Sequence, residues 1–380
     1  MTYFEQIEHC RLCRAELPGN ALITLFPFPK AAQHFLTSKQ LDNESPIELA
    51  VFQCNKCDLV QLKAAPVSYF REVITAAVLS PHSRTTRLNE ITTFVKKYNL
   101  LGKTALEIGC GKGGMLDVIV DAGLRAEGIE YSESSVEEGV LFERSMICGY
   151  LPDQKITKKA EVFFSFNYLE HQPDIKQFID SIYTNSTDNA VGYITVPNLS
   201  YLLESKCLYE FVADHLVYFT VSTLRRAFEL NGFDVLECQE INNSNDILAI
   251  VRKRSSLRLD SYMEEVNSLS AELNTLVDKY VSVGKKVAVW GAGHRTLALL
   301  AISKLNNIEF IIDSAPFKQG LFSPVMLTKI VSPETLEYSD VDAVIVMVPG
   351  IYPQEVLNIV KNFKRKFNTY LLEGNKIVAY

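Results

Sequence analysis

The sequence predicts an α/β fold made of two doubly wound units, preceded by a cysteine-rich module. Strand-like and helix-like stretches alternate from about residue 82 to 254, a polar helical stretch follows, and the alternation restarts near Gly284. Strands that alternate with helices indicate a parallel sheet. The length of 380 residues also exceeds what one hydrophobic core usually supports, so more than one domain is expected.

The composition is that of an ordinary globular protein. Apolar residues make up 47% of the chain and charged residues 22%, and the formal net charge is −7. A negative net charge argues against non-specific nucleic-acid binding. The first residues lack the basic and apolar regions of a secretory signal, and no apolar run approaches the roughly 18 residues of a membrane span. We therefore expect a cytoplasmic protein without a membrane or nucleic-acid partner.

The first segment, residues 1–80, contains two Cys-x-x-Cys pairs. Cys10 and Cys13 form the first pair, and Cys54 and Cys57 form the second. Each pair places two thiolates on one tight turn, and two such turns close a tetrahedral zinc site. Four unrelated buried cysteines are the alternative. Because four thiolates leave no open coordination position, the predicted zinc is structural.

The second segment, residues 81–254, contains the first α/β unit. The stretch TTRLNEITTFVKKYNLLG predicts an amphipathic helix that ends near Gly102, and KTALEIGCG predicts a strand that runs into a glycine turn. Further buried strands are predicted in LRAEGIEYS, EVFFSFN and AVGYITVPN. These elements predict a parallel sheet flanked by helices.

The glycine turn of this unit contains Gly109, Gly111 and Gly113, with Glu107 ahead of it. Glycines let the backbone approach a ligand closely, and the helix N-terminus supplies free N–H groups. Glu130, at the end of the next predicted strand, can accept hydrogen bonds from both ribose hydroxyls of an adenosine. These residues predict a binding site for an adenosine-containing cofactor.

This pattern resembles the E/D-x-G-x-G-x-G motif of class I S-adenosylmethionine-dependent methyltransferases. The same residues loosely fit a dinucleotide-binding GxGxxG fingerprint through Gly109, Gly111 and Gly114, so a nucleotide oxidoreductase and a non-catalytic nucleotide fold remain alternatives. The methyltransferase resemblance implies a Rossmann-like core that binds S-adenosylmethionine. It also implies that the loop FNYLEHQPD, with Asn167 at the cofactor, borders both ligands. His171 in this loop is either catalytic or a structural loop histidine.

The third segment, residues 255–380, begins with a polar helical connector over 255–280. The stretches KKVAVWGAGHRT, IEFIIDS and DAVIVMVPG predict three strands of a second doubly wound unit. The strand–turn–helix pattern at 286–302 is weakly analogous to the one at 104–120. A glycine turn of this kind can hold an anionic group, and Arg295 can add a charge-assisted contact.

The order of these parts resembles the zinc-containing sugar C-methyltransferases, which act on nucleotide-linked keto-deoxysugars. The resemblance covers nearly the whole chain and rests on FQCNKCDLVQL, ALEIGCGKGGML, VAVWGAGHRT, IIDSAPFKQG and VSPETL. It implies that the third segment helps to hold the nucleotide end of a sugar-nucleotide acceptor, although a wall without ligand contacts is an alternative. The residues assigned to acceptor binding are Tyr218, Gly291, Gly293, His294, Arg295, Asp313 and Lys318.

The stretch EFVADHLVYFT places Asp214 and His215 among apolar and aromatic residues. The resembled family has roughly Tyr-His-Glu-His-Leu-x-Tyr-Phe here, and its last histidine is the proposed general base. His215 matches that histidine, Asp214 replaces the glutamate, and Val212 and Ala213 replace the first two residues. The resemblance implies C-methylation with His215 as base and Asp214 as its partner. The alternatives are an Asp cap with a core histidine, O- or N-methylation of another sugar or natural product, and a non-catalytic nucleotide-binding protein.

Overall fold

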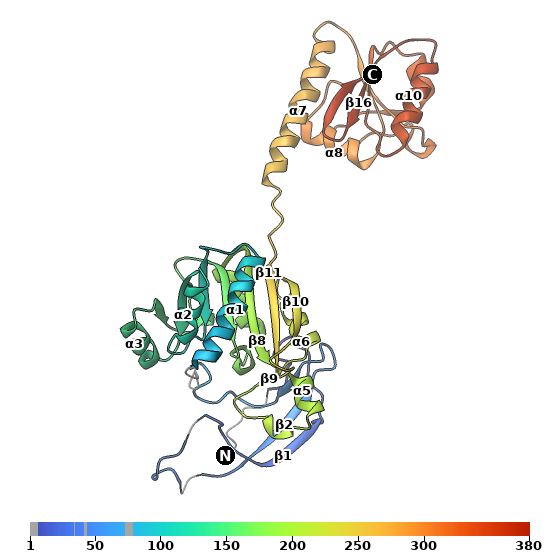
Figure 1. The fold of residues 1–380 in the computed structure, drawn as a ribbon. Helices are drawn as coiled ribbons and strands as arrows, with labels where there is room; N and C mark the ends of the chain where they lie inside the picture. The colour runs from blue at the N-terminus through green and yellow to red at the C-terminus, as the bar shows by residue number, and fades with distance from the viewer. Residues whose placement is uncertain (1–6, 34, 42–43, 73–78) are drawn as a thin grey trace. The chain divides into compact units, whose positions relative to one another are not determined.

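A computed structural model describes residues 7–33, 35–41, 44–72 and 79–380. The chain divides into two compact units between Ser256 and Leu257, and each unit is described by itself (Figure 1). Within the described ranges, no helix has both the length and the apolar character that crossing a membrane requires.

The first unit is built around a seven-stranded sheet of order β10-β11-β8-β7-β4-β5-β6. β4 through β8 are parallel where they pair, while β10 and β11 form an antiparallel hairpin that adds to β8. The parallel sheet confirms the expectation from the alternating pattern. The strands are β4 Thr104–Ile108, β5 Arg125–Glu130, β6 Met146–Cys148, β7 Ala160–Phe166, β8 Ser186–Pro197, β10 Phe233–Ile241 and β11 Asp246–Lys253.

Helices cover both faces of this sheet. Phe163 on β7 packs in a cluster with residues of α4 and α6, whereas its neighbours Val162 and Phe164 pack with residues of α1 and α2. This alternation of buried side chains produces the predicted doubly wound, Rossmann-like core. The helices are α1 Pro81–Lys97, α2 Gly114–Asp121, α3 Glu133–Leu141, α4 Ile175–Asn185, α5 Leu199–Glu204 and α6 Val221–Leu230.

The bounds of α1 differ from the predicted helix. The helix begins earlier, because Ser80 caps its N-terminus by accepting a hydrogen bond from the Ser83 N–H and Pro81 occupies its first position. It ends at Lys97, before the predicted end near Gly102, because Asn99 takes a left-handed φ of +56°. The chain then turns toward β4.

A second, antiparallel sheet joins the cysteine-rich segment to the core. Its order is β1-β2-β3-β9, with bounds β1 Ile23–Phe28, β2 Ile47–Gln53, β3 Val60–Leu62 and β9 Val217–Tyr218. β9 belongs to the stretch that contains Asp214 and His215. The N-terminal segment therefore pairs directly with the segment that carries the candidate base.

The second unit has a six-stranded sheet of order β14-β13-β12-β15-β16-β17, parallel except for the β16–β17 hairpin. Val287 and Val289 pack with α7 and α8, while Ala288 and Trp290 pack with α9 and α10. Helices thus cover both faces, as predicted. The elements are α7 Asp260–Val281, β12 Val287–Trp290, α8 His294–Ser303, β13 Ile311–Ile312, β14 Ile330–Val331, α9 Pro333–Glu337, β15 Ala343–Val346, α10 Tyr352–Asn362, β16 Asn368–Glu373 and β17 Lys376–Ala379.

Candidate functional site

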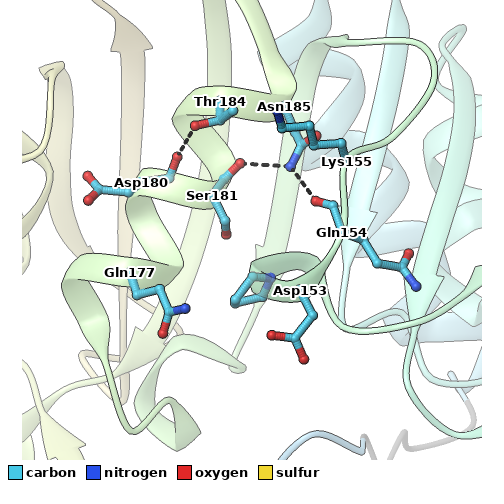
Figure 2. A pocket seen from close by; sticks show the side chains of 9 residues that line it. Asp153, Gln154, Lys155, Gln177, Asp180, Ser181, Thr184 and Asn185 are labelled. Carbon is cyan, nitrogen blue, oxygen red and sulfur yellow. Dashed lines mark hydrogen bonds between the residues drawn. The ribbon is translucent and has the colours of Figure 1, made fainter.

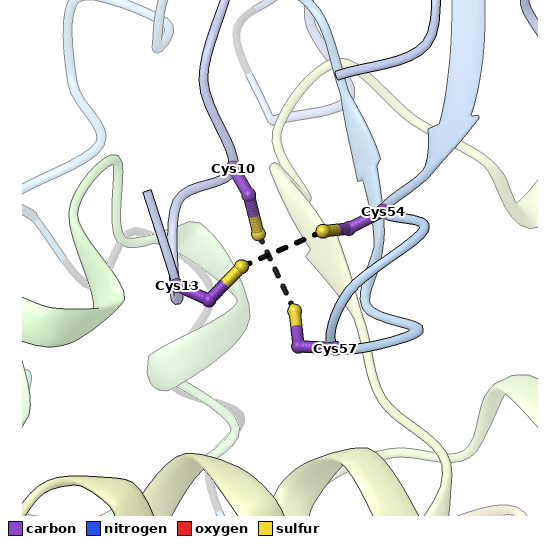
Figure 3. A group of neighbouring side chains, drawn as sticks. All are labelled: Cys10, Cys13, Cys54 and Cys57. Carbon is purple, nitrogen blue, oxygen red and sulfur yellow. Dashed lines mark hydrogen bonds between the residues drawn. The ribbon is translucent and has the colours of Figure 1, made fainter. Parts of the chain in front are cut away.

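The four cysteines of the two Cys-x-x-Cys pairs lie together in the first unit (Figure 3). Their sulfurs are all within 4.8 Å of one another, and the Sγ–Sγ distance is 3.5 Å both for Cys10–Cys57 and for Cys13–Cys54. Zn–S bonds of about 2.3 Å in a tetrahedron put the sulfurs about 3.8 Å apart, so the arrangement fits a four-thiolate zinc site. The hydrogen bond between Cys10 and Cys57 lowers the pKa of the Cys10 thiol to about 5 and raises that of the Cys57 thiol, so one thiolate of this pair is favoured.

Arg11, inside the first cysteine pair, connects these cysteines to the core. It is 1% exposed, and its guanidinium donates to the carbonyl oxygens of Pro173 at 2.8 Å, Leu62 at 3.3 Å and Ala64. Burial lowers its pKa to about 10, so the side chain remains charged near neutral pH. The cysteine-rich segment therefore holds the end of the loop that contains His171.

The predicted glycine turn lies between β4 and α2. The φ angles of Gly109, Gly111 and Gly113 are +71°, +53° and +81°, in the region that glycine adopts without a steric penalty. A Cβ atom at Gly109 would lie 2.6 Å from the ring of Tyr168. The turn is therefore packed against the loop that contains His171.

Two buried glutamates face this turn from the ends of neighbouring strands. Glu130 is 1% exposed and accepts hydrogen bonds from the N–H groups of Gly111 and Ser132, both at 3.0 Å. Glu107 is 3% exposed, and its Oε2 has no hydrogen-bond partner among the described residues. Burial, and then the charge of Glu130, raise the pKa of Glu107 well above its usual value. Such a site fits a ligand that brings hydroxyl donors and a positive charge, and S-adenosylmethionine carries both.

Asn167 lies at the same edge of the sheet, after β7, with a φ of +44°. Its side chain is engaged within the protein, because Thr195 Oγ1 donates to Asn167 Oδ1 at 2.6 Å and Asn167 Nδ2 donates to Asp246 Oδ1 at 3.3 Å. The residue is exposed and directly follows the carboxyl end of β7.

Two histidines from distant segments of the sequence lie in contact. The ring centroids of His171 and His215 are 4.7 Å apart in an edge-to-face arrangement. His171 Nδ1 lies 2.8 Å from the carbonyl oxygen of Asp214 and so carries the proton, which leaves Nε2 as an acceptor. The Leu216 N–H donates to the carbonyl oxygen of Glu170 at 2.8 Å. These two bonds hold the segments of the two histidines together.

The carboxylate of Asp214 is buried and bonds to two N-terminal segments. Its Oδ2 accepts from the Ala32 N–H at 2.6 Å, and its Oδ1 accepts from the Tyr69 hydroxyl at 2.6 Å. Among the described residues no hydrogen bond joins this carboxylate to the ring of His215. The Asp214 carboxylate therefore holds its own loop to residues Ala32 and Tyr69, whereas the Asp214 backbone carbonyl contacts His171.

A buried carboxyl group, Glu170, lies beside the histidine pair, and no motif in the sequence indicates it. Glu170 is 2% exposed, and one of its carboxylate oxygens and a ring nitrogen of each histidine lie within 4.8 Å of one another. Burial raises the pKa of Glu170 to about 8. Burial, and then His171, lower the pKa of His215 to about 3. The only sequence signal for Glu170 is its position beside His171 in a loop after a strand.

Tyr218 follows His215 closely and forms part of the wall around it. It is 3% exposed, its ring centroid is 6.2 Å from that of His215, and burial raises its pKa. Its hydroxyl accepts from the Val212 N–H at 2.8 Å and lies 3.2 Å from the Val212 carbonyl oxygen. The hydroxyl is thus used within its own loop.

Several predicted acceptor residues of the second unit gather at the turn after β12. Between Gly291 and Gly293, the Ala292 N–H donates to Asp313 Oδ2 at 2.8 Å. Lys318 Nζ donates to the same Asp313 oxygen at 3.0 Å and to the Ala292 carbonyl oxygen at 3.1 Å. Burial opposes the ionisation of Asp313, but hydrogen bonds from two backbone N–H groups and from Lys318 lower its pKa.

His294 and Arg295 begin α8. His294 is exposed, and Arg295 donates to the Gly374 carbonyl oxygen at 2.9 Å. Arg295 also lines a cavity of about 640 Å³ between the start of α8, the loop after β15 and the β16–β17 turn. In the described residues no bond joins Arg295 to Asp313 or Lys318, so the predicted set divides between this cavity and the glycine turn.

A separate polar depression of about 330 Å³ lies between the 3-10 helix Leu151–Asp153 and α4 (Figure 2). Asn185 Nδ2 there donates to the carbonyl oxygens of Gln154 at 3.2 Å and Ser181 at 3.0 Å. The Asn185 amide is therefore bonded within the chain. None of the predicted site residues lines this depression.

Comparison with known proteins identifies both α/β units. A methyltransferase domain family matches residues 81–238, and a C-methyltransferase C-terminal domain family matches residues 251–372. C-methyltransferase NovU of Streptomyces niveus is 23% identical over 373 aligned residues, which cover 86% of each chain. These matches favour the methyltransferase interpretation over the oxidoreductase and non-catalytic alternatives.

Solved structures similar to part of the chain include two methyltransferases. One, from Clostridium acetobutylicum, is 12% identical with a TM-score of 0.40, and the match covers 45% of this chain and 92% of the other. The other is magnesium protoporphyrin IX methyltransferase of Synechocystis, solved with bound SAH. It is 16% identical with a TM-score of 0.38, and the match covers 45% of this chain and 83% of the other.

Proposed function

We propose that this chain, which is an S-adenosylmethionine-dependent methyltransferase, methylates a carbon atom of a nucleotide-linked keto-deoxysugar. The C-methyltransferase C-terminal domain match and the similarity to C-methyltransferase NovU support a carbon acceptor. The observation that carries the chemistry is the contact between His215 and His171, which belongs to the loop that packs on the proposed cofactor turn. A carbon acceptor next to a ketone needs a base of this kind.

The cofactor is assigned to the turn between β4 and α2. S-adenosylmethionine supplies an electrophilic methyl group when it is bound there. Glu130 would accept the ribose hydroxyls, and the unpartnered Glu107 oxygen would face the positive charge of the ligand. The full proposed set is Glu107, Gly109, Gly111, Gly113, Glu130 and Asn167.

His215 is the proposed general base. Its lone pair takes the proton from the carbon beside the ketone, and the electrons of that C–H bond pass to the ketone oxygen as an enolate. Because burial keeps its pKa low, the imidazole is unprotonated at neutral pH and available for this step. Asp214 and Tyr218 fix the segment around it through the bonds described above.

The four cysteines are the proposed ligands of a structural zinc ion. The second unit is the proposed acceptor-binding unit, with Arg295 at its cavity and the turn around Asp313 and Lys318 as contacts for the nucleotide. A second candidate reaction is O- or N-methylation of another sugar or natural product. His215 would serve as base there too, and its unprotonated ring favours either reaction equally.

Replacing His215 tests the proposal. His215→Asn should keep the fold and the affinity for S-adenosylhomocysteine, and it should reduce turnover by roughly 10²–10⁴, the usual span for a positioned acid–base group. His82→Asn, at an exposed histidine of α1, is the matched control. Wild-type turnover in His215→Asn would show that His215 is a packing residue.

An exchange experiment separates carbon from oxygen or nitrogen acceptors. With S-adenosylhomocysteine in place of the methyl donor, the wild-type protein should exchange the acidic proton of a keto-sugar nucleotide with deuterated water, and His215→Asn should not. NMR of the methylated product then gives the methylated atom. Methylation on oxygen or nitrogen without exchange would be consistent with His215 as a base but would rule out the enolate intermediate.

A further inference from the structure

The group formed by Glu170, His171 and His215 has a feature that the proposed mechanism leaves unused. Glu170 is a buried carboxyl group whose Oε2 has no hydrogen-bond partner among the described residues. No ion pair to Glu170 is found there either. An ionisable group in such surroundings is costly to keep charged unless a partner of opposite charge forms nearby.

The charged and titratable groups around Glu170 identify that partner. Asp246 on β11 raises the pKa of Glu170 further, and Asp214 is engaged with Ala32 and Tyr69. The Tyr218 hydroxyl is a further titratable neighbour, because burial, and to a smaller extent the charge of Glu170, raise the Tyr218 pKa. The two imidazoles each have a ring nitrogen within 4.8 Å of the carboxylate oxygen. Of these groups, the two imidazoles are the ones that can carry a positive charge.

The two histidines are not equivalent. His171 Nδ1 is bonded to the carbonyl oxygen of Asp214, which fixes the tautomer and the orientation of that ring. The His215 ring has no hydrogen bond among the described residues, and it contacts His171 through an edge-to-face arrangement. Each ring therefore keeps a nitrogen that can accept a proton, and the choice of His215 follows from its proposed role as base.

We propose that Glu170, and not Asp214, is the positioning residue that stabilises the imidazolium formed on His215. This inference rests on the proposed role of His215 as base. When His215 takes the proton from the acceptor carbon, the C–H bond breaks, an N–H bond forms, and the electron pair remains on the acceptor as enolate. The Glu170 carboxylate then faces a cation in a buried site, and its charge offsets that of the ring.

The pH dependence of this arrangement has a definite sign. The pKa of Glu170 is raised to about 8 by burial, so the carboxylate form is gained as the pH rises through about 8. The basicity of His215 should increase in the same interval, because an opposite charge within about 4–6 Å raises a histidine pKa by about 1–3 units. Turnover at saturating substrate should therefore rise through about pH 8.

Glu170→Gln tests this inference because it keeps the size of the side chain and removes its charge. The ratio of wild-type to variant kcat should grow with pH, from less than about threefold at pH 6.5 to about tenfold or more at pH 9. Glu161→Gln, which removes a carboxylate bonded to Lys103 at the other end of β7, is the control and should leave the profile unchanged. Parallel wild-type and variant profiles would overturn the proposal.

NMR of the histidine rings gives a readout that does not depend on catalysis. In labelled wild-type protein bound to S-adenosylhomocysteine, the His215 ring, assigned through His215→Asn, should show a second transition near pH 8 that reports Glu170. That transition should disappear in Glu170→Gln and persist in Glu170→Asp, which also serves if the glutamine variant does not fold. A His215 signal without this transition would refute the pairing even if His215 is the base. If the wild type shows the NMR transition near pH 8 but does not exchange the acceptor proton with deuterated water, only the removal of a proton from carbon by His215 would be refuted.

Discussion

At the scale of single residues, an acid at the end of a strand forms the same contacts in both units. Glu130 accepts hydrogen bonds from Gly111 in the first glycine turn and from the N–H group two residues further along the chain. Asp313 accepts them from Ala292 in the second turn and likewise from the N–H group two residues on. The weak sequence analogy between the two strand–turn–helix segments therefore corresponds to a shared local geometry, in which the acid fixes the turn.

Replacing Glu130 tests its proposed contact with the cofactor. Glu130→Ala should weaken binding of S-adenosylhomocysteine by about 10- to 100-fold, because hydrogen bonds to a charged group contribute about 1.5–3 kcal/mol. Calorimetry measures this directly. Glu127→Ala, on the same strand and bonded to the Ser145 hydroxyl, should bind S-adenosylhomocysteine as the wild type does. If Glu130→Ala binds S-adenosylhomocysteine as tightly as the wild type, the cofactor does not bind at this turn.

Which residues the sequence predicts and which it misses depends on sequence distance. Glu107 and the glycines lie within one short stretch, so their spacing alone indicates a turn that binds a ligand. Glu170 and His215 are 45 residues apart in the sequence (215 minus 170), and they come close only because the fold brings their two loops together. Tyr69 bonds to Asp214 across 145 residues. Contacts of this kind have no period or spacing in the sequence that could reveal them.

At the scale of elements, most central parallel strands were predictable and the antiparallel hairpins were not. β4, β7 and β8 contain apolar runs because both of their faces are covered by helices. The β10–β11 and β16–β17 hairpins escaped prediction. β10, β16 and β17 contain polar or charged residues, and the apolar run of β11, which lies between β10 and β8, does not indicate an antiparallel partner. β9 has only two residues and pairs with β3, so its existence depends on the cysteine-rich segment.

Loss of the cysteine-rich segment should destabilise other parts of the first unit, because this segment contacts both loops that contain the histidines. It supplies β3 to the β3–β9 pair, and Arg11 bonds to the carbonyl oxygen of Pro173 beyond His171. Cys57→Ser should lower the zinc content from about one per chain and destabilise this segment, because metal binding and folding are coupled. Metal analysis and thermal unfolding are the measurements, with Cys148→Ser, an exposed cysteine outside the group, as control. Full stability and activity after complete zinc removal would exclude a structural metal.

At the scale of the whole molecule, two units that share an architecture carry different groups of residues. The first carries the turn proposed for the cofactor, the four cysteines and the histidine pair, and the second carries a turn closed by Asp313 and a cavity lined by Arg295. The doubly wound form of both units was predictable from the alternation of elements. The division of the proposed acceptor residues between turn and cavity was not, because it depends on where Arg295 points from the start of α8.

This division leads to a prediction about the second unit. Arg295→Ala should raise the KM for the sugar-nucleotide acceptor by about tenfold or more, since a charge-assisted hydrogen bond to a phosphate contributes about 1.5–3 kcal/mol. The affinity for S-adenosylhomocysteine should stay unchanged, because the cofactor turn belongs to the first unit. Lys285→Ala, at an exposed lysine before the opposite end of β12, should leave both values as in the wild type. Steady-state kinetics with varied acceptor, together with calorimetry of the cofactor product, measures the two quantities. A variant that loses cofactor affinity while keeping its acceptor KM would show that the second unit has been assigned the wrong ligand.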